Sequence, residues 1–356
     1  MRITNAEVWR MDIPLSVPYT IAYETYTESK TVFLRIETSS GLTGFGAATP
    51  DSYVTGENAA EVEQLCRSSC IPILKNSDPL RYAKTMDIIG KQISGHPSTK
   101  ALVDMALHDL LGKVAGIPVW KLLGGYRSKI ETSVTVGILS PEKTAKSIQN
   151  LLNQGIKIIK LKGGLDLEQD LATLNHIAET FGKSIVLRFD ANQGYTHQQT
   201  LYFITHYPAG LQLEILEQPV PFDQHRQLGL ITKHSPVPIM ADESVASLQD
   251  AYHLVRHNLV DMINIKLMKS GGIANGLHIN SVARASGTEV MVGCMDECQL
   301  GIAAGLHFTL SRPNIRFADL DGFMDLEDDP TAGCIHMKKG FLYPSSSPGL
   351  GLKTLL

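Results

Sequence analysis

The most constraining feature of this sequence is a series of short apolar segments, each of which ends in an ionisable residue. The segment ends follow one another at intervals of 24 to 28 residues, which is enough chain for one strand, one helix and two loops. Short β-rich apolar runs are typical of strands that are buried on both faces of a parallel sheet. The chain is therefore expected to repeat a strand–helix unit. The segment ends are Lys162, Asp190, Glu217, Asp242, Lys266, Cys294 and Asp319.

This repeat predicts an α/β fold, a modified (β/α)8 barrel with an N-terminal α+β capping domain. We expect the barrel to occupy residues 126–321 and to carry polar groups at the C-terminal ends of its strands, where such barrels hold their active sites. Residues 1–125 are predicted to form the cap, with strands first and amphipathic helices from about residue 55 to residue 113. The glycine-rich stretch GLTGFGAATP (41–50) is interpreted as a turn. Residues 322–356 are expected to pack back on the cap.

A possible specificity loop lies near residues 16–29, between the first two predicted strands. Its sequence, VPYTIAYETYTES, is rich in tyrosine and threonine. The segment can form a solvated hairpin or a mobile lid, because long loops near a site often carry specificity. The sequence leaves both interpretations open.

Composition limits the partners that this chain can have. A net charge of −4 and a pI of about 6.3 provide no electrostatic footprint for nucleic acid or an anionic membrane. No run approaches the ~18 apolar residues that a membrane span requires, and five cysteines favour reduced thiols. We expect a cytoplasmic homo-oligomer with a small-molecule substrate and no nucleic-acid or membrane partner.

Three acidic residues, Asp190, Glu217 and Asp242, end three successive predicted strands. Neighbouring strands are about 4.8 Å apart, so carboxylates at equivalent depth approach one another and raise one another's pKa. A divalent cation removes this repulsion, and all-oxygen ligation suits Mg²⁺. The alternative is that these acids are helix N-caps or surface ion pairs. The register of all three favours a metal site.

Three lysines surround the same predicted rim. Lys160 and Lys162 lie two residues apart on one strand, so their side chains share a face, and each is expected to depress the pKa of the other. A lysine whose pKa falls toward neutrality can act as a general base. Lys266 ends the sixth strand, across the rim. Two bases on opposite sides of one carbon suit stereochemical inversion, whereas a single strand-end lysine is usually a solvated charge.

Five motifs lie along the predicted strand ends: KLK (160–162), FDANQGY (189–195), EILEQPV (214–220), MADES (240–244) and NIKLMKSGG (264–272). Taken together they resemble the enolase superfamily, muconate-lactonising subgroup. Members of that superfamily combine a Lys or His base with Mg²⁺. The resemblance implies a cap that closes over the barrel, Mg²⁺ on Asp190, Glu217 and Asp242, and a substrate carboxylate held by the metal. It also implies that Lys162 and Lys266 act at the α-carbon of that substrate.

The segment ADLDGF resembles the DxD motif of dipeptide epimerases, through Asp319 and Asp321. In that group the pair binds the free α-ammonium of the substrate; the alternative here is a helix N-cap followed by a turn. The resemblance thus implies an isomerase, a Mg²⁺-dependent dipeptide epimerase. Its reaction is a two-base 1,1-proton transfer at the α-carbon of the C-terminal residue, through an enediolate.

Two positions depart from the Ala-Glu epimerases that this chain resembles. Glu24 stands where they carry an arginine, and Asp296 stands where they carry an apolar residue. Two carboxylates are expected to repel an acidic C-terminal residue, which leaves an aliphatic or a basic residue as candidates. Thr135 and Cys294 are further predicted substrate contacts.

Residues behind the site, and other functions, complete the sequence-based predictions. Arg188, Asn192 and Asn264 are expected to orient the metal ligands from behind. The alternative reactions on the same site are β-elimination, as in o-succinylbenzoate synthesis, and racemisation of N-acylamino acids. Both substrates lack a free ammonium, so the Asp319–Asp321 pair argues against them. A non-catalytic binding or scaffold barrel is the alternative from another class, and the intact acids and bases argue against it.

Overall fold

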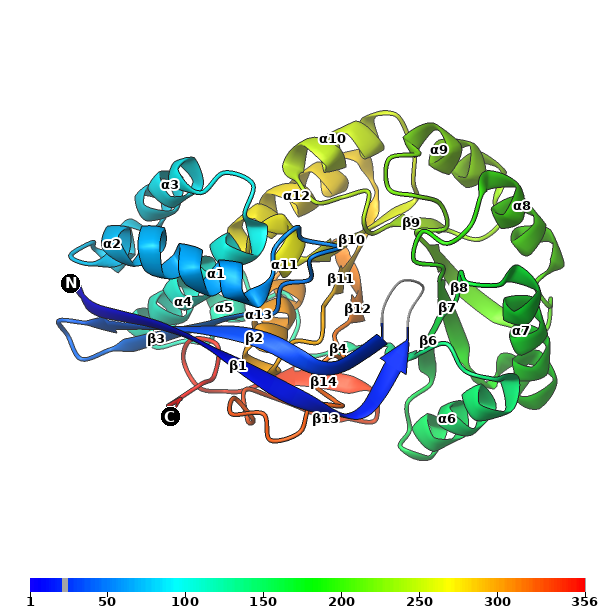
Figure 1. The fold of residues 1–356 in the computed structure, drawn as a ribbon, viewed down its shortest axis with the longest axis horizontal. Coiled ribbons are helices and arrows are strands. Elements are labelled where there is room, and N and C mark those ends of the chain that lie inside the picture. The colour runs from blue at the N-terminus through cyan, green and yellow to red at the C-terminus, as the bar shows by residue number, and fades with distance from the viewer. Residues whose placement is uncertain (21–24, 356) are drawn as a thin grey trace.

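The computed structural model describes residues 1–20 and 25–355. The described chain forms a mixed cap at the left of Figure 1 and a ring of alternating strands and helices at the right. The predicted fold class, a modified (β/α)8 barrel with an N-terminal cap, is confirmed by this arrangement.

The cap begins with a three-stranded antiparallel sheet in the order β1-β2-β3. Strand β1 (Ile3–Thr20) and strand β2 (Thr25–Thr38) form a long ribbon in which Tyr19 pairs with Tyr26. The described part of the possible specificity loop therefore belongs to a hairpin. This ribbon reaches from the cap to the barrel (Figure 1).

The glycine-rich stretch that was expected to be a turn is instead strand β3 (Thr43–Ala48), so this prediction is wrong. The reason is close packing against helix α4 (Pro97–Ala115). A Cβ atom at Gly46 would lie 2.1 Å from the carbonyl oxygen of Leu102, and one at Gly44 would lie 2.6 Å from that of Ala106. These glycines allow a helix to approach the sheet, rather than allowing the backbone to turn.

Helices cover one side of the cap sheet. Asn58 caps the first of them, since its side chain accepts from the Glu61 amide while the Glu61 side chain accepts from the Asn58 amide. Helix α4 is buried along most of its length and ends at Gly116, which has the left-handed conformation. The cap helices are α1 (Ala59–Leu65), η1 (Cys66–Cys70), α2 (Ile71–Leu74), η2 (Pro79–Arg81), α3 (Tyr82–Gln92), α4 and α5 (Val119–Leu122).

The barrel consists of eight parallel strands in sequential order. An isolated parallel bridge between Thr132 and Ala318 brings its first and last strands together. The strands are β5 (Val134–Val136), β6 (Ile158–Lys162), β7 (Val186–Asp190), β8 (Gln212–Glu217), β9 (Ile239–Ala241), β10 (Met262–Lys266), β11 (Glu289–Gly293) and β12 (Ile315–Asp319).

The outer helices begin at clear sequence signals. Ser140, Asp166, Thr196 and Ser247 each accept a backbone N–H bond at a helix start through their side chains. The helices are α6 (Pro141–Asn153), α7 (Leu167–Phe181), η3 (Gly182–Ser184), α8 (His197–His206), α9 (His225–His234), α10 (Leu248–Arg256), α11 (Leu267–Ser270), α12 (Ile273–Ser286) and α13 (Gln299–Leu310).

The segment after β12 forms a hairpin that the sequence did not predict. Strands β13 (Ile335–Lys338) and β14 (Phe341–Pro344) pair with each other, and β14 pairs with β4 (Ile130–Glu131). Beyond them, the amide of Leu350 donates to the buried Asp109 of α4 at 2.8 Å. Of the helices in the described ranges, none combines the length and apolar character needed to cross a membrane.

Candidate active site

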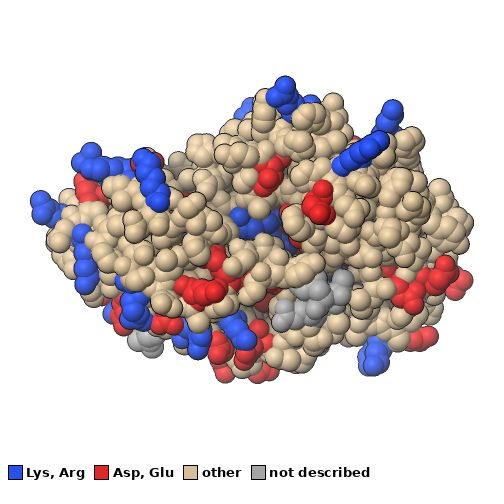
Figure 2. Space-filling view, turned by 45° about the horizontal axis from the view of Figure 1, so that its top comes forward, with Lys and Arg blue, Asp and Glu red and all other residues tan. Residues whose placement is uncertain are grey.

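A cavity of about 780 Å³ lies between the β1–β2 ribbon and the C-terminal ends of the barrel strands. Cap residues such as Tyr19 and Asp51 line one side, and Lys162, Lys266 and Asp321 line the other. Figure 2 shows charged atoms of both signs in a hollow near the centre of this face. The cavity is therefore closed by two parts of the chain that are far apart in sequence.

The three predicted metal ligands lie at one rim because neighbouring parallel strands end in register. Asp190 pairs with Glu217 across β7 and β8, and Asp242 directly follows β9. All three side chains are fully buried. Their carboxylates lie beneath the lysines that line the cavity.

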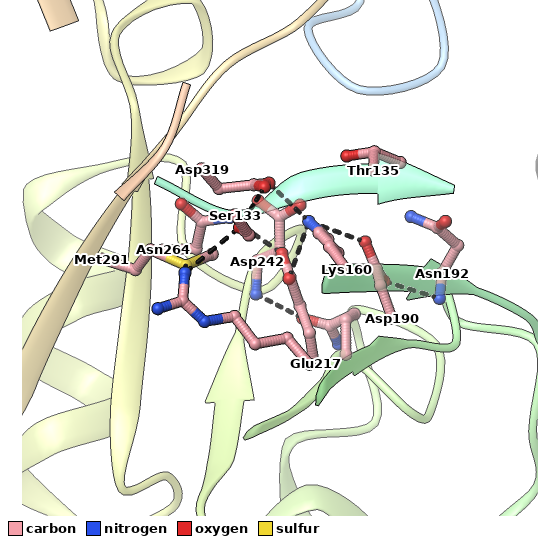
Figure 3. A network of polar contacts seen from close by, with 12 residues as sticks. Ser133, Thr135, Lys160, Asp190, Asn192, Glu217, Asp242, Asn264, Met291 and Asp319 are labelled. Atoms are coloured by element: carbon pink, nitrogen blue, oxygen red, sulfur yellow. Dashed lines mark hydrogen bonds and ion pairs between the residues drawn. The ribbon is translucent and has the colours of Figure 1, made fainter. Parts of the chain in front are cut away.

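Lys160 lies at the centre of these acids (Figure 3). Its Nζ is 3.1 Å from Asp190, 2.8 Å from Glu217 and 2.8 Å from Asp319. Burial lowers the pKa of Lys160, but the surrounding carboxylates outweigh burial and raise this pKa well above its usual value. The expectation that the pKa of Lys160 would fall is wrong, because the charges of Asp319, Glu217, Asp190 and Asp242 all raise it.

Lys162 and Lys266 lie on opposite flanks of the acids, on β6 and β10. Lys162 Nζ is 2.8 Å from Asp190, and Lys266 Nζ is 2.7 Å from Asp242. Both lysines line the cavity. Strands β7, β8 and β9 separate them, so a molecule seated over the acids has one ammonium on each side.

The residues fit a hard divalent cation. Two buried carboxylate oxygens, Glu217 Oε2 and Asp242 Oδ2, lie 2.8 and 2.7 Å from the Nζ atoms of Lys160 and Lys266 without forming a hydrogen bond. Burial and the Asp190 charge raise the pKa of Glu217 to about 7. In the described ranges no three such side chains already surround one point, since each carboxylate leans toward a lysine. Buried carboxylate oxygens are the donors that Mg²⁺ prefers.

Asp319 and Asp321 lie beside this set. Asp319 accepts from Ser133 Oγ at 2.7 Å and from Lys160 at 2.8 Å, so both of its oxygens are engaged. Asp321 Oδ2 accepts from the Thr135 amide at 2.6 Å. Burial, together with Asp319, raises the pKa of Asp321 to about 7. Thr135 lines the cavity and its backbone N–H meets Asp321, while its contact with the substrate stays a prediction.

Asp296 faces the cavity from the loop after β11. Both of its carboxylate oxygens lie 2.9 Å from the Tyr19 hydroxyl, and Ser29 Oγ donates to its carbonyl at 2.6 Å. Burial raises the pKa of Asp296 to about 6. Cys294 also lines the cavity, and burial raises the pKa of its thiol. Glu24 lies outside the described residues.

Comparison with known proteins assigns the family. A family model described as enolase C-terminal domain-like matches residues 143–354. A second, described as the mandelate racemase / muconate lactonizing enzyme N-terminal domain, matches residues 3–124. The chain belongs to the enolase superfamily.

Members of the superfamily with different named substrates are similar over the full length. The L-Ala-D/L-Glu epimerase of Bacillus subtilis (strain 168) is 37% identical, with 99% of this chain and 97% of that protein covered. The L-Lys-D/L-Arg epimerase of Desulforapulum autotrophicum is 35% identical, with both chains fully covered. A dipeptide epimerase from Enterococcus faecalis V583, complexed with Mg and L-Leu-L-Tyr, superimposes with a TM-score of 0.96 at 35% identity, covering 99% of this chain and 100% of that one.

The three residues expected to orient the metal ligands of this enolase-superfamily site differ in what they contact. Asn264 Nδ2 donates to Glu217 at 2.8 Å, and the backbone N–H of Asn192 donates to Asp190 at 2.9 Å. Among the described residues, Arg188 forms no hydrogen bond or ion pair with Asp190. Its guanidinium instead donates to Glu214 at 2.8 Å and to the Ala318 carbonyl at 2.8 Å, because it crosses the barrel interior below the rim.

Sequence reasoning missed two residues of this site. Lys269 is buried and donates to the Asp242 carboxylate and carbonyl. Ser133 donates to Asp319. The sequence signal for Lys269 was its position three residues after Lys266. This spacing brings both lysines to Asp242 only because helix α11 begins directly after strand β10. No comparable signal marked Ser133.

Proposed function

We propose that this protein is a Mg²⁺-dependent dipeptide epimerase, an isomerase that inverts the α-carbon of the C-terminal residue. The observation that carries the proposal is the placement of Lys162 and Lys266 on opposite flanks of three buried carboxylates. Mg²⁺ held by Asp190, Glu217 and Asp242 would bind the substrate carboxylate and offset the negative charge that develops on it.

The two lysines perform the proton transfer. Lys162, in its neutral form, takes the proton from the α-carbon of an L-residue, so a C–H bond breaks and an N–H bond forms. Lys266, in its ammonium form, gives a proton to the opposite face of the same carbon. The reverse reaction exchanges the two roles. Lys160 remains an ammonium group, because three carboxylates hold it.

The free α-ammonium of the dipeptide is assigned to the Asp319–Asp321 pair. Asp321 is the better placed of the two, because Ser133 and Lys160 already engage both oxygens of Asp319. A substrate ammonium would offset the negative charge of Asp321, which burial and the neighbouring Asp319 disfavour. The zwitterion is thus recognised at both ends, with its carboxylate over the metal ligands and its ammonium over this pair.

A basic C-terminal side chain fits the cavity better than an acidic or an aliphatic one. Asp51, Asp296 and Asp325 line the same cavity, and Asp51 and Asp325 lie close enough to raise the pKa of Asp296. Besides Lys160, Lys162 and Lys266, the described lining residues include one further cation, Lys30, which pairs with Glu28 at 3.5 Å. A substrate cation would meet Asp296, whose carboxylate is stabilised by the Tyr19 hydroxyl and, to a smaller extent, by Lys162.

The decisive experiment is a dipeptide screen in D₂O, read by NMR and mass spectrometry. We expect Mg²⁺-dependent incorporation of one deuteron at the α-carbon of the C-terminal residue, fastest for Ala-Lys or Ala-Arg. N-acetylated dipeptides and chelator-treated protein serve as controls. Deuterium in N-acylamino acids but not in free dipeptides would favour the racemase alternative, and elimination without exchange would favour a synthase. No exchange with any substrate would favour a non-catalytic barrel.

The remaining sequence-based expectations belong to the same proposal. Residues 1–125 act as the cap, residues 126–321 carry the chemistry, and residues 322–356 pack back on the cap. A homo-oligomeric state and a cytoplasmic location stay predictions.

A further inference from the structure

Each of the three proposed metal ligands is held in the same divided way. One oxygen of each carboxylate faces a cavity lysine, and the other accepts from a donor that is fixed by the fold. At Asp190 the fixed donor is the backbone N–H of Asn192, and at Glu217 it is the side-chain amide of Asn264. At Asp242 it is Lys269.

Lys269 is the unusual member of this set because it is charged. Its Nζ donates both to Oδ1 and to the carbonyl oxygen of Asp242, while Lys266 lies 2.7 Å from Oδ2. Lys269 is 2% exposed, and it is not among the described residues that line the cavity. It can therefore act on a substrate only through Asp242.

The fold fixes Lys269 by clamping the short helix α11 against the cap. The turn that ends α11 presses on Asp104 of α4, since a Cβ atom at Gly272 would lie 2.5 Å from that side chain. Asp104 also accepts from the Ile273 amide at 2.6 Å. The position of the Lys269 ammonium is thus set by contact between the barrel and the cap.

We propose that Lys269 is a positioning residue that fixes the Asp242 carboxylate and thereby places Lys266, the base on that flank. This inference rests on the proposed epimerase function. Lys162 is tied to Asp190 rather than to Asp242, so loss of Lys269 disturbs the two flanks unequally. Removal of Lys269 leaves the buried Asp242 carboxylate with Lys266 as its one close ammonium among the described residues and leaves Oδ1 without its donor, a change that destabilises a buried ion pair.

The first test is α-proton exchange in D₂O with Ala-L-Lys and Ala-D-Lys, comparing the parent with Lys269→Met. We expect exchange from the D-substrate, which uses Lys266, to fall at least tenfold further than exchange from the L-substrate. Asn264→Ala is the matched control, because Glu217 lies between the flanks and its loss of a donor should slow both substrates equally. Lys100→Met, on α4 beside Gly271, should leave both rates unchanged. Equal losses from both substrates in Lys269→Met, or no loss, would overturn the proposal.

The second test needs no activity. Lys269→Met should lower the thermal midpoint of the metal-free protein by about 5 °C or more, whereas the same change in an Asp242→Asn background should cost little, because an amide needs no ammonium partner. If Lys269→Met alone fails to fold, recovery in the double variant supports the proposal. An equal loss in both backgrounds would show that Lys269 only fills space. Absence of exchange in the parent would instead refute the proposed function, and this thermal cycle would still report on Lys269.

Discussion

Two sides of the cavity differ in how their carboxylates are stabilised. The floor is the barrel rim with Lys160, Lys162 and Lys266, and the roof is the side with Tyr19, Tyr26, Asp51 and Asp296. On the floor, buried carboxylates are paired with lysines of the barrel, at distances of 2.7 to 3.1 Å. In the roof, Asp296 and Asp51 are paired with the hydroxyls of Tyr19 and Tyr26, which belong to the cap ribbon. A lysine can gain or lose a proton during a reaction, whereas the tyrosine hydroxyls stabilise their carboxylates through hydrogen bonds. In the proposed reaction the floor lysines therefore carry the proton transfer and the roof carboxylates select the substrate.

Removal of a metal ligand should have the largest effect. Asp242→Ala is expected to lower kcat by about a thousandfold or more, because the charge developing on the substrate carboxylate loses its stabilisation, an effect of several kcal/mol. Activity against Ala-Lys with and without EDTA measures this. Asp223→Ala, which removes an exposed carboxylate, should behave as the parent. Full activity after chelation would show that the triad has another role.

Removal of one base should separate the two halves of the floor chemistry. Lys266→Ala is expected to abolish full epimerisation while exchange at the α-carbon of the L-substrate survives through Lys162. Parallel measurement of optical rotation and deuterium content distinguishes the two processes. Equal turnover of both epimers by this variant would refute the two-base scheme.

Substitution of Asp296 should change the preference between substrates rather than lower the reaction rate. A charge about 5 Å away, at an effective dielectric near 20, contributes roughly 3 kcal/mol, or a factor of about 100. Asp296→Ile should therefore lower the ratio of kcat/KM for Ala-Lys over Ala-Glu by about 10- to 100-fold, allowing for screening. If the parent protein already prefers Ala-Glu, Asp296 does not select for a basic C-terminal residue.

The same preference should depend on pH. Burial raises the pKa of Asp296 to about 6, Tyr19 and Lys162 oppose this, and Asp325 and Asp51 reinforce it. As pH falls through about 6 the carboxylate gains a proton, so the preference for Ala-Lys over Ala-Val should decline between pH 7 and pH 5. Asp296→Asn should show a flat ratio over this range. Because the folded-state pKa is raised, the charged carboxylate lowers stability above pH 6, and that penalty disappears as the pH falls.

The smallest effect is expected from the phenol that shields Asp296. Tyr19→Phe removes one donor and leaves the stacking on Tyr26, whose ring centroid is 5.5 Å away. We expect KM for Ala-Lys to change several-fold and kcat to change little. A large fall in kcat with unchanged KM would show that Tyr19 takes part in the reaction itself rather than in substrate binding.

The sequence predicted what depends on strand order and missed what depends on packing. The rim carboxylates and flanking lysines could be predicted because parallel strands of similar length end together. The pKa of Lys160 could not, since it depends on which acids surround the ammonium. Strand β3 was misinterpreted because Gly44 and Gly46 serve contact with α4, which no local pattern reveals. The direction of Arg188 and the helical start at α11, which carries Lys269, likewise require the assembled barrel.

The carboxylate of Asp109 has a consequence for how the protein is made. It accepts from the amide of Phe45 at 2.9 Å and from that of Leu350 at 2.8 Å, and it is fully buried. The cap is translated first, yet Asp109 in its interior receives one of its hydrogen bonds from the amide of Leu350, which is synthesised 241 residues later. Early synthesis therefore yields a cap whose interior is incomplete, and its final consolidation is post-translational. A chain released before residue 350 should be a substrate for chaperones and proteases rather than a free-standing cap.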